Sequence, residues 1–212
     1  MQVTNPPSIT SQDLLALAQA AHGKINRLYL HWTAGRYHQF FDDYHLNVDE
    51  DGQVYRTCHS LAERKAHTYK RNTGSVGIAL CCALDASWTA TMPKFGTMPP
   101  TLKQLKSLAW IVAILCTALG IAITSDTVMT HGEAAYRDGY GPGSGDPETR
   151  WDLFWVLDEQ GAFRQGGVYV RELARQYSTR LVPSQRKGAE QNAYPTSEVG
   201  AAAPLQVPLF ME

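Results

Sequence analysis

Residues 28–35 read LYLHWTAG, an apolar stretch that runs through a histidine and a tryptophan into a turn of small residues. The apolar run predicts a buried strand, which we place at residues 27–32. A buried strand has no structural need of an imidazole, whereas a metal site at the edge of a sheet does. His31 is therefore a candidate ligand, and the rest of the chain has to supply its partners.

The composition indicates one globular domain with a sizeable core, because 44% of the 212 residues are hydrophobic and 18% are charged. The net charge of −1 favours neither a nucleic-acid partner nor a membrane surface. The opening residues, MQVTNPPSITSQDLL, lack the basic and apolar regions of a secretory signal, so we expect synthesis in the cytoplasm. The apolar run 108–123 is shorter than the roughly 20 residues of a spanning helix, so we expect a core helix and no membrane insertion.

Strands and helices are mixed along the chain. Further strands are predicted at residues 44–49, 53–56 and 75–83, a short strand or extended segment at 127–130, and helices at residues 10–21 and 101–121. The turn signal Asp51–Gly52 makes a hairpin of the first two of these strands. This order favours a single α/β domain with a mixed central β-sheet flanked by α-helices. We divide the chain into a helical extension (1–25), a catalytic domain (26–180) and a flexible or loosely docked tail (181–212).

The cysteines form no CxxC pair, and Cys81–Cys82 lies in an apolar run. We expect all four to be buried reduced thiols, with a soft-metal site at Cys81–Cys82 as the less favoured alternative. Among the seven histidines, His31 and His131 stand out, because each follows a strand-like stretch and precedes small residues. A catalytic zinc needs three protein ligands and an open position, so two imidazoles and a carboxylate would suffice.

Five segments in sequence order resemble the zinc-dependent N-acetylmuramoyl-L-alanine amidases that share a fold with peptidoglycan recognition proteins. They are LYLHWTAG, DDYHLNVDEDGQVYR, HTYKRNTGSVGIAL, PPTLKQLKSLAWIVAILC and THGEAA. The resemblance covers about residues 26–157. It implies the peptidoglycan recognition protein-like fold, a Zn²⁺ cofactor, and hydrolysis of the amide bond between N-acetylmuramic acid and the L-alanine of the stem peptide.

The resemblance also implies a set of site residues. His31 and His131 match the first two zinc ligands, and Asp152 matches the third, two residues after the basic Arg150. Asp146 competes with Asp152, because the loop between His131 and Arg150 is longer than is usual in the family.

Tyr44 and Arg150 match catalytic positions near the metal. Ala79 stands where some members carry a glutamate for proton transfer. Glu133 is the nearest substitute for that glutamate, or alternatively a partner that holds an imidazole tautomer. Four residues are expected to bind substrate: His67, Asn72, Arg36 and Tyr37.

Two other functions compete with this one. A binding module of the same fold would recognise peptidoglycan without cutting it, but such proteins typically lose the third ligand, and Asp152 is present. A zinc peptidase of another fold is disfavoured because HExxH is absent, and GYGPGSG lacks the ending of a phosphate-binding P-loop. We expect action in the periplasm after delivery by a holin or a secretion system. The protein would then be a phage endolysin or an antibacterial effector, the latter with an immunity protein, whereas a recycling enzyme fits less well.

Overall fold

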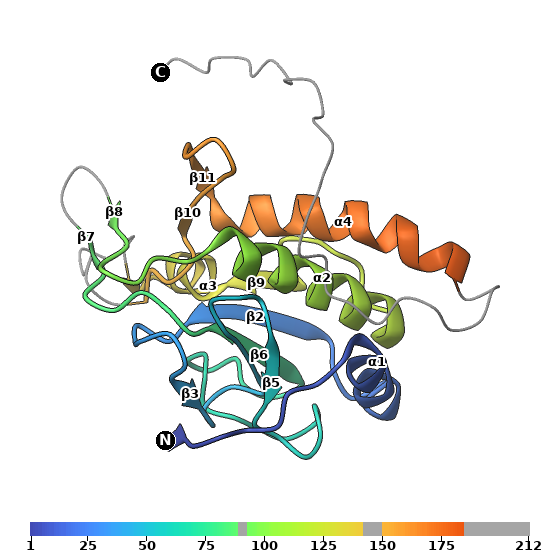
Figure 1. The fold of residues 1–212 in the computed structure, drawn as a ribbon. Helices are drawn as coiled ribbons and strands as arrows, with labels where there is room; N and C mark the ends of the chain where they lie inside the picture. The colour runs from blue at the N-terminus through green and yellow to red at the C-terminus, as the bar shows by residue number, and fades with distance from the viewer. Residues whose placement is uncertain (89–92, 142–149, 185–212) are drawn as a thin grey trace.

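The computed structural model describes residues 1–88, 93–141 and 150–184 and has a five-stranded mixed sheet at its centre (Figure 1). The strand order is β5-β4-β6-β2-β9. These strands are β2 (Arg27–Trp32), β4 (Leu46–Val48), β5 (Val54–Arg56), β6 (Ser75–Leu80) and β9 (Val128–Thr130). The helices are α1 (Ser11–Ala20), α2 (Leu102–Leu119), α3 (His131–Arg137) and α4 (Gly166–Ser184). The predicted mixed sheet flanked by helices is confirmed.

Three two-stranded pairs lie outside the central sheet. They are β1 (Gln2–Val3) with β3 (Phe40–Phe41), β7 (Ser87–Trp88) with β8 (Pro93–Lys94), and β10 (Trp155–Leu157) with β11 (Phe163–Gln165). In the central sheet, β4, β6, β2 and β9 are parallel, and only the hairpin strand β5 is antiparallel. The carboxyl ends of the four parallel strands therefore meet at one edge, where residues distant in sequence come together.

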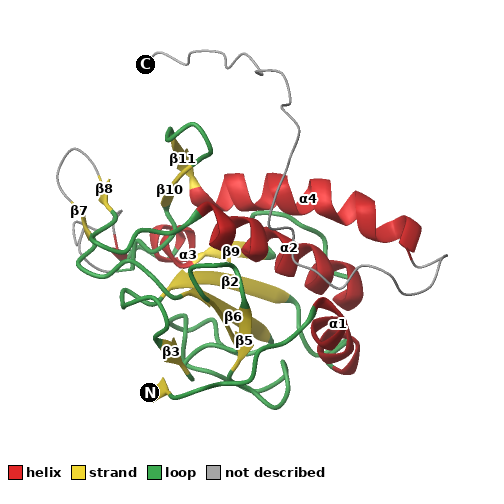
Figure 2. Ribbon diagram, in the orientation of Figure 1, coloured by secondary structure: helices red, strands yellow, loops and turns green. Residues whose placement is uncertain are grey.

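The two faces of the sheet differ in chemistry. Alternate residues such as Leu28, Leu30 and Ile78 belong to the main hydrophobic core, which they share with α1, α2 and α4. We call this the core face. The residues between them, Tyr29 and His31, pair in register with Gly77 and Ala79 and form what we call the site face. Figures 1 and 2 show α2 and α4 side by side over the sheet, with loops rather than long helices on the opposite side.

Helix α2 lies within the predicted range 101–121 and ends at Gly120, one residue before the end of that range. Thr101 caps its amino end in a reciprocal capping box with Gln104, and Gly120 ends it with φ at 70°, a left-handed conformation that favours glycine. Within the described residues, α2 alone is long and apolar enough to cross a membrane, but most of it is buried inside the protein. All four cysteines are free and buried, as predicted.

Several elements differ from the sequence prediction. The strands predicted at 44–49 and 75–83 are shorter, because only β4 and β6 join the ladder. Helices α3 and α4 were not predicted at all. Helix α4 runs four residues past the expected end of the catalytic domain at 180, and most of the expected tail (185–212) lies outside the described residues.

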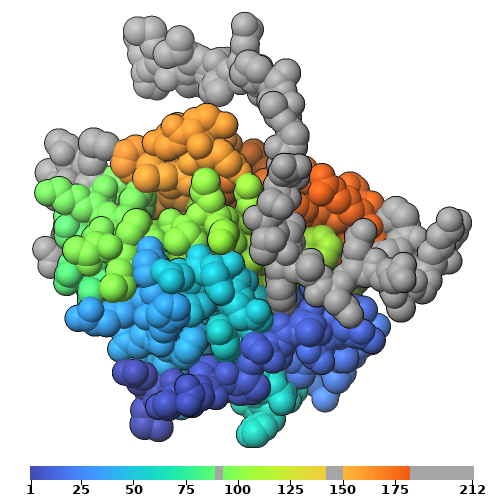
Figure 3. All heavy atoms as spheres, in the orientation of Figure 1, coloured from blue at the N-terminus to red at the C-terminus, as the bar shows by residue number. Residues whose placement is uncertain are grey.

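The amino-terminal segment, predicted to be an extension, lies against the body of the protein (Figure 3). Strand β1 pairs with β3, and the backbone N–H of Ile9 donates to Val54 on β5 at 2.9 Å. Ile9 and Leu14 both belong to the main core. The division of the chain at residues 25 and 181 stays a prediction, but the packing is continuous across residue 25.

Candidate metal centre

Three side chains converge at the carboxyl edge of the sheet. His31 lies near the end of β2 on the site face and is fully buried. His131 is the first residue of α3, directly after β9, and the capping box of Thr130 and Glu133 fixes this helix start. Asp152 comes from the loop before β10, where its carbonyl oxygen accepts a hydrogen bond from Gly132 N–H at 3.2 Å. Secondary structure thus positions two ligands, and a backbone contact positions the third.

The distances between these side chains fit a tetrahedral metal. His31 Nδ1 lies 3.1 Å from both His131 Nδ1 and Asp152 Oδ2, and His131 Nδ1 lies 3.3 Å from Asp152 Oδ1. Bonds of about 2.0 Å to tetrahedral zinc place neighbouring ligand atoms about 3.3 Å apart. Three atoms with lone pairs pointing at one another repel unless a cation or protons lie between them. Two imidazoles and a carboxylate are a donor set that zinc accepts.

The protonation states also suit a metal. Burial lowers the pKa of His31 to about 4, so its imidazole is neutral and able to ligate at neutral pH. Burial opposes ionisation of Asp152, but the nearby imidazoles of His131 and His31 outweigh it and hold the pKa of Asp152 below its usual range. Asp146, the competing ligand, lies outside the described residues.

The loop that carries Asp152 has an unusual backbone. Arg150 and Leu153 have φ of 60° and 56°, and a left-handed conformation costs such residues about 1–2 kcal/mol each. Tertiary contacts hold the loop in place, since Leu153 is fully buried and the Trp151 ring packs edge-to-face on Trp32 with centroids 4.5 Å apart. The carboxylate of Asp152 is therefore presented by a segment that its surroundings fix.

A hydroxyl holds the outer nitrogen of His31. Thr68 Oγ1 lies 3.3 Å from His31 Nε2 and 2.9 Å from His67 Nδ1. With the proton on Nε2 directed at the hydroxyl, Nδ1 of His31 is left free to face the metal. Sequence reasoning missed Thr68, which had no signal beyond its place next to His67, because its contact with His31 spans 37 residues.

The predicted substrate residues His67 and Asn72 lie beneath the site. His67 is buried, and a Cβ on Gly77 would lie only 2.5 Å from its ring. Asn72 Oδ1 accepts hydrogen bonds from the backbone N–H groups of His67 and Thr68. Their visible roles are to fill the site face and to shape the loop, so binding of substrate by either stays a prediction.

Tyr44 and Arg150 lie beside the ligands. The Tyr44 ring is 5.1 Å from that of His31, and burial raises the Tyr44 pKa, so its hydroxyl remains a hydrogen-bond donor. Arg150 is exposed, and its charge opposes the rise of the Tyr44 pKa. Tyr44 therefore lies beside a predicted ligand, and the catalytic roles of Tyr44 and Arg150 stay predictions.

The carboxylate of Glu133 is paired with Arg171. Its carboxylate accepts hydrogen bonds from both Nη atoms of Arg171, each at 2.8 Å, and from the backbone N–H of Thr130 at 3.0 Å. Among the described residues it makes no hydrogen bond to an imidazole. This geometry favours a structural role, in which Glu133 ties the start of α3 to α4.

Arg36 and Tyr37 follow β2 on an adjoining loop. The Tyr37 hydroxyl donates to the carbonyl of Pro99 at 2.6 Å, and Arg36 N–H donates to the Gln39 side chain at 3.0 Å. Neither residue contacts the three ligands in the described structure, and their contact with substrate stays a prediction.

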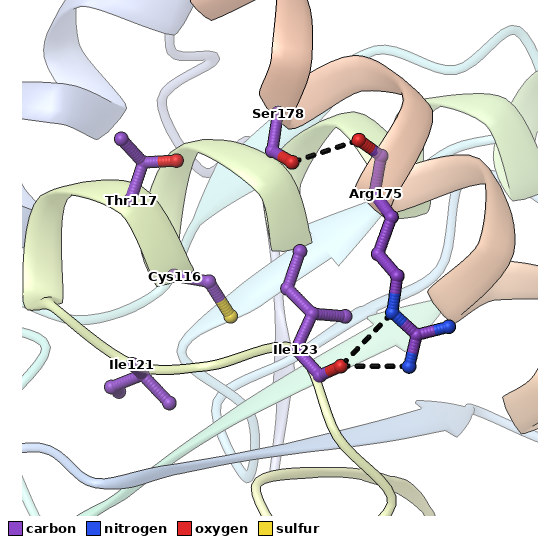
Figure 4. Close-up of a pocket in the computed structure, with 6 residues that line it drawn as sticks. All are labelled: Cys116, Thr117, Ile121, Ile123, Arg175 and Ser178. Atoms are coloured by element: carbon purple, nitrogen blue, oxygen red, sulfur yellow. Dashed lines mark hydrogen bonds between the residues drawn. The ribbon is translucent and has the colours of Figure 1, made fainter. Parts of the chain in front are cut away.

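A separate cavity lies between α2 and α4 and shows no catalytic chemistry (Figure 4). Its polar groups satisfy one another, because the Arg175 guanidinium donates to the Ile123 carbonyl and Ser178 Oγ donates to the Arg175 carbonyl. Its floor includes the buried thiol of Cys116, whose pKa burial raises to about 12. We assign no catalytic role to this cavity.

Comparison with protein families agrees with the geometry. The family model described as N-acetylmuramoyl-L-alanine amidase matches residues 21–147, which include β2, β6, α2 and the segment with His131. No curated protein matches the chain. The matched segment is more than half of the chain. The chain therefore belongs to the N-acetylmuramoyl-L-alanine amidase family and is an enzyme that acts on peptidoglycan.

Proposed function

We propose that the enzyme is a zinc-dependent amidase that cuts the bond between N-acetylmuramic acid and the L-alanine of the stem peptide. The observation that carries this proposal is the convergence of two imidazole nitrogens and one carboxylate, 3.1–3.3 Å apart and buried. His31, His131 and Asp152 would hold the ion. The family match supports the reaction, and this donor set supports the metal.

The chain's own residues divide the remaining work. When bound, zinc would supply Lewis-acid polarisation of the scissile carbonyl and a water of lowered pKa. Arg150 stabilises the negative charge that develops on the carbonyl oxygen, because a guanidinium stays charged at any working pH. Tyr44, kept protonated by burial, donates a hydrogen bond that orients the attacking water or the oxyanion. Thr68 holds the His31 tautomer.

The proton-transfer group differs from that of family members with a glutamate next to the first ligand. Ala79 pairs in register with His31, so a glutamate at this position would stand beside the metal, and here there is only a methyl group. Because the Glu133 carboxylate accepts hydrogen bonds from Arg171, we assign no carboxylate to proton transfer.

The first test is a digest of purified Gram-negative sacculi with mass spectrometry of the soluble products. The arms are the zinc-loaded enzyme, the enzyme with chelator, the chelated enzyme after zinc is added back, and Asp152→Ala. Asp126→Ala, at an exposed position, is the matched control. We expect free stem peptides that begin at L-alanine, lost with chelator and in Asp152→Ala, and regained with zinc.

Each other outcome has a clear meaning. No release by folded, zinc-loaded enzyme would contradict the proposal and favour a module that only binds peptidoglycan. Release that persists in Asp152→Ala would move the third ligand to Asp146. Release that survives chelation would remove the metal from the mechanism.

We also propose that the enzyme acts in the periplasm after delivery by a holin or a secretion system. The support is that peptidoglycan lies beyond the cytoplasmic membrane. Expression in a Gram-negative host with and without an added export signal tests this proposal. Lysis only with the signal is expected, whereas lysis without it would show that the chain crosses the membrane unaided.

A further inference from the structure

A series of hydrogen bonds joins the metal centre to the segment that leads into β6. His31 Nε2 lies 3.3 Å from Thr68 Oγ1, which lies 2.9 Å from His67 Nδ1. His67 Nε2 lies 3.4 Å from Ser75 Oγ, and Ser75 Oγ donates a hydrogen bond of 2.9 Å to the carbonyl of Arg71. A predicted metal ligand is therefore connected, contact by contact, to a distant backbone carbonyl. We call this series the His31–Arg71 network.

The four side chains of this network are shielded from water. His31, His67, Thr68 and Ser75 are all buried, and none of them is more than 5% exposed. A buried polar group that lacks a partner costs about 1–3 kcal/mol. Each proton in the network must therefore be directed at an acceptor, so the position of one proton determines the position of the next.

The Arg71 carbonyl sets the direction of the network, because a carbonyl can only accept. The single hydroxyl proton of Ser75 is directed at it, which leaves the Ser75 oxygen as an acceptor for His67 Nε2. Burial lowers the pKa of His67, so its ring is neutral, and a proton on Nε2 leaves Nδ1 to accept from the Thr68 hydroxyl. Thr68 in turn accepts from Nε2 of His31. Nδ1 of His31 is left with a free lone pair, the form that a zinc ligand requires.

Neighbouring groups hold the network in place. Asn72 Oδ1 accepts hydrogen bonds from the backbone N–H groups of His67 and Thr68, at 3.1 and 2.8 Å, and so fixes the backbone that carries both side chains. A Cβ on Gly77 would lie 2.5 Å from the His67 ring, so the missing side chain of this β6 residue makes room for the imidazole. The ring and the hydroxyl are therefore both held in one position.

The same segment is attached to the helix of the second ligand. The Arg71 guanidinium makes two hydrogen bonds of 2.6 Å to Asp138, the C-cap of α3, whose first residue is His131. The Tyr69 ring packs edge-to-face on that of Tyr140, just beyond α3, with centroids 5.8 Å apart. The segment therefore contacts the first ligand through its hydroxyl and the helix of the second ligand through these two side chains.

We infer that Thr68, His67 and Ser75 together are positioning residues, which hold His31 in the tautomer that presents Nδ1 to the metal ion. The Arg71 carbonyl imposes this tautomer through the three side chains. They act through His31, and partners of this kind typically change metal affinity by about 10–100-fold. This inference rests on the proposed function, because it requires a metal ion at His31.

Nitrogen NMR of the metal-free protein tests the direction of the network. Long-range couplings between ring nitrogens and ring protons distinguish the two neutral tautomers of an imidazole. In wild type we expect the proton on Nε2 in both His67 and His31. In Thr68→Val, Nε2 of His31 loses its acceptor, so its proton should move to Nδ1, where Asp152 Oδ2 lies 3.1 Å away. The wild-type tautomers test the inference even if Thr68→Val does not fold.

Zinc affinity, measured by competition with a chromophoric chelator, is the second readout. Thr68→Val replaces the hydroxyl by a methyl group of similar shape and should raise the Kd for zinc by about 10–100-fold. Thr68→Ser keeps the hydroxyl and should bind zinc nearly as tightly as wild type. Ser75→Ala removes the acceptor of the His67 proton, and we expect the Kd to rise by about tenfold. Thr117→Val, at an exposed position of α2, is the matched control.

The failures are distinguishable. A proton on Nδ1 of His67 in wild type would reverse the network and overturn the inference. Equal zinc affinity of Thr68→Val and Thr68→Ser, in a wild-type background that binds zinc and cleaves peptidoglycan, would also overturn it and leave the amidase proposal standing. A folded wild-type protein without affinity for zinc would instead overturn the proposed function on which the inference rests.

Discussion

The buried imidazoles of the site face bind protons weakly. Nδ1 of His45 accepts a hydrogen bond from Gly77 N–H at 3.0 Å, and the Glu63 carbonyl lies 2.8 Å from Nε2, so both nitrogens are committed in the neutral form. Burial lowers the pKa of His45, like that of His31, to about 4. The unfolded value is about 6.5. Between these values the unfolded chain binds more protons than the folded one.

The stability of the metal-free protein should therefore depend on pH. The contribution of these groups is fully present above about pH 6.5 and is lost as the pH falls toward 4. Urea unfolding at pH 7, 5.5 and 4.5 measures it, and the midpoint is expected to fall. His45→Gln should flatten the dependence, with His59→Gln at an exposed position as control. A midpoint that rises on acidification would refute the assignment of neutral imidazoles.

The role of the Glu133 carboxylate, structural or catalytic, can be determined by measuring the free energy of unfolding and kcat of one variant. Glu133→Gln replaces one acceptor oxygen of the Arg171 pair by a donor, so the free energy of unfolding is expected to fall by about 2 kcal/mol. The kcat per folded molecule should change only a few-fold. Denaturant titration and turnover on the same preparation test this, with Glu172→Gln as the exposed control. Undiminished stability with a hundredfold loss of kcat would instead assign proton transfer to Glu133.

Among the elements, α2 is fastened to the sheet by one buried amide. Gln104 is fully buried, and its Nε2 donates to the carbonyls of Val48 and Cys81, both at 3.0 Å. These carbonyls lie at the ends of β4 and β6, so the amide joins the helix to the edge of the sheet where the site forms. A carboxylate in its place would face two carbonyl oxygens without a proton to donate.

Gln104→Glu should accordingly lower the free energy of unfolding by about 3 kcal/mol. Gln176→Glu makes the same chemical change on an exposed turn of α4 and is expected to stay within about 0.5 kcal/mol. Urea titrations of both variants at pH 7 give the comparison. Equal effects of the two substitutions would show that the amide does not hold α2.

The elements also show what a sequence can and cannot predict. Helix α2 was predictable because its cap, its apolar period and its terminal glycine agree. Helix α4 was missed because it opens on Gly166–Gly167, which weaken any helix signal, although Val170, Tyr177 and Leu181 recur at helical spacing. His31 and His131 were predictable at strand ends. The contacts of Thr68, Arg171 and Tyr140 join segments far apart in sequence, and no local pattern encodes them.

At the scale of the whole molecule, the amino-terminal segment and the catalytic body share one core. Leu14 on α1 is fully buried in the cluster that includes residues of β2, β6 and α2. Leu14→Ala should lower the free energy of unfolding by about 3 kcal/mol. Tryptophan fluorescence and far-ultraviolet circular dichroism should still report one coincident transition. Leu15→Ala, at the neighbouring exposed position, is the control.

Two separate transitions in Leu14→Ala would contradict this expectation. They would restore the predicted division of the chain at residue 25, with a helical extension that melts independently of the amidase body.

The two unlike faces of the sheet also determine which amino-acid substitutions each strand position can accept. Along β2 and β6, positions such as Leu28, Leu30 and Ile78 belong to the apolar core, and exchange among aliphatic side chains of similar volume costs little there. The intervening Gly77 is pressed against an imidazole, and Ala79 stands beside a predicted metal ligand. If every substitution along these strands were tested for function, the tolerance to substitution would therefore alternate from one residue to the next. Core-face positions would accept many residues, and site-face positions would accept very few.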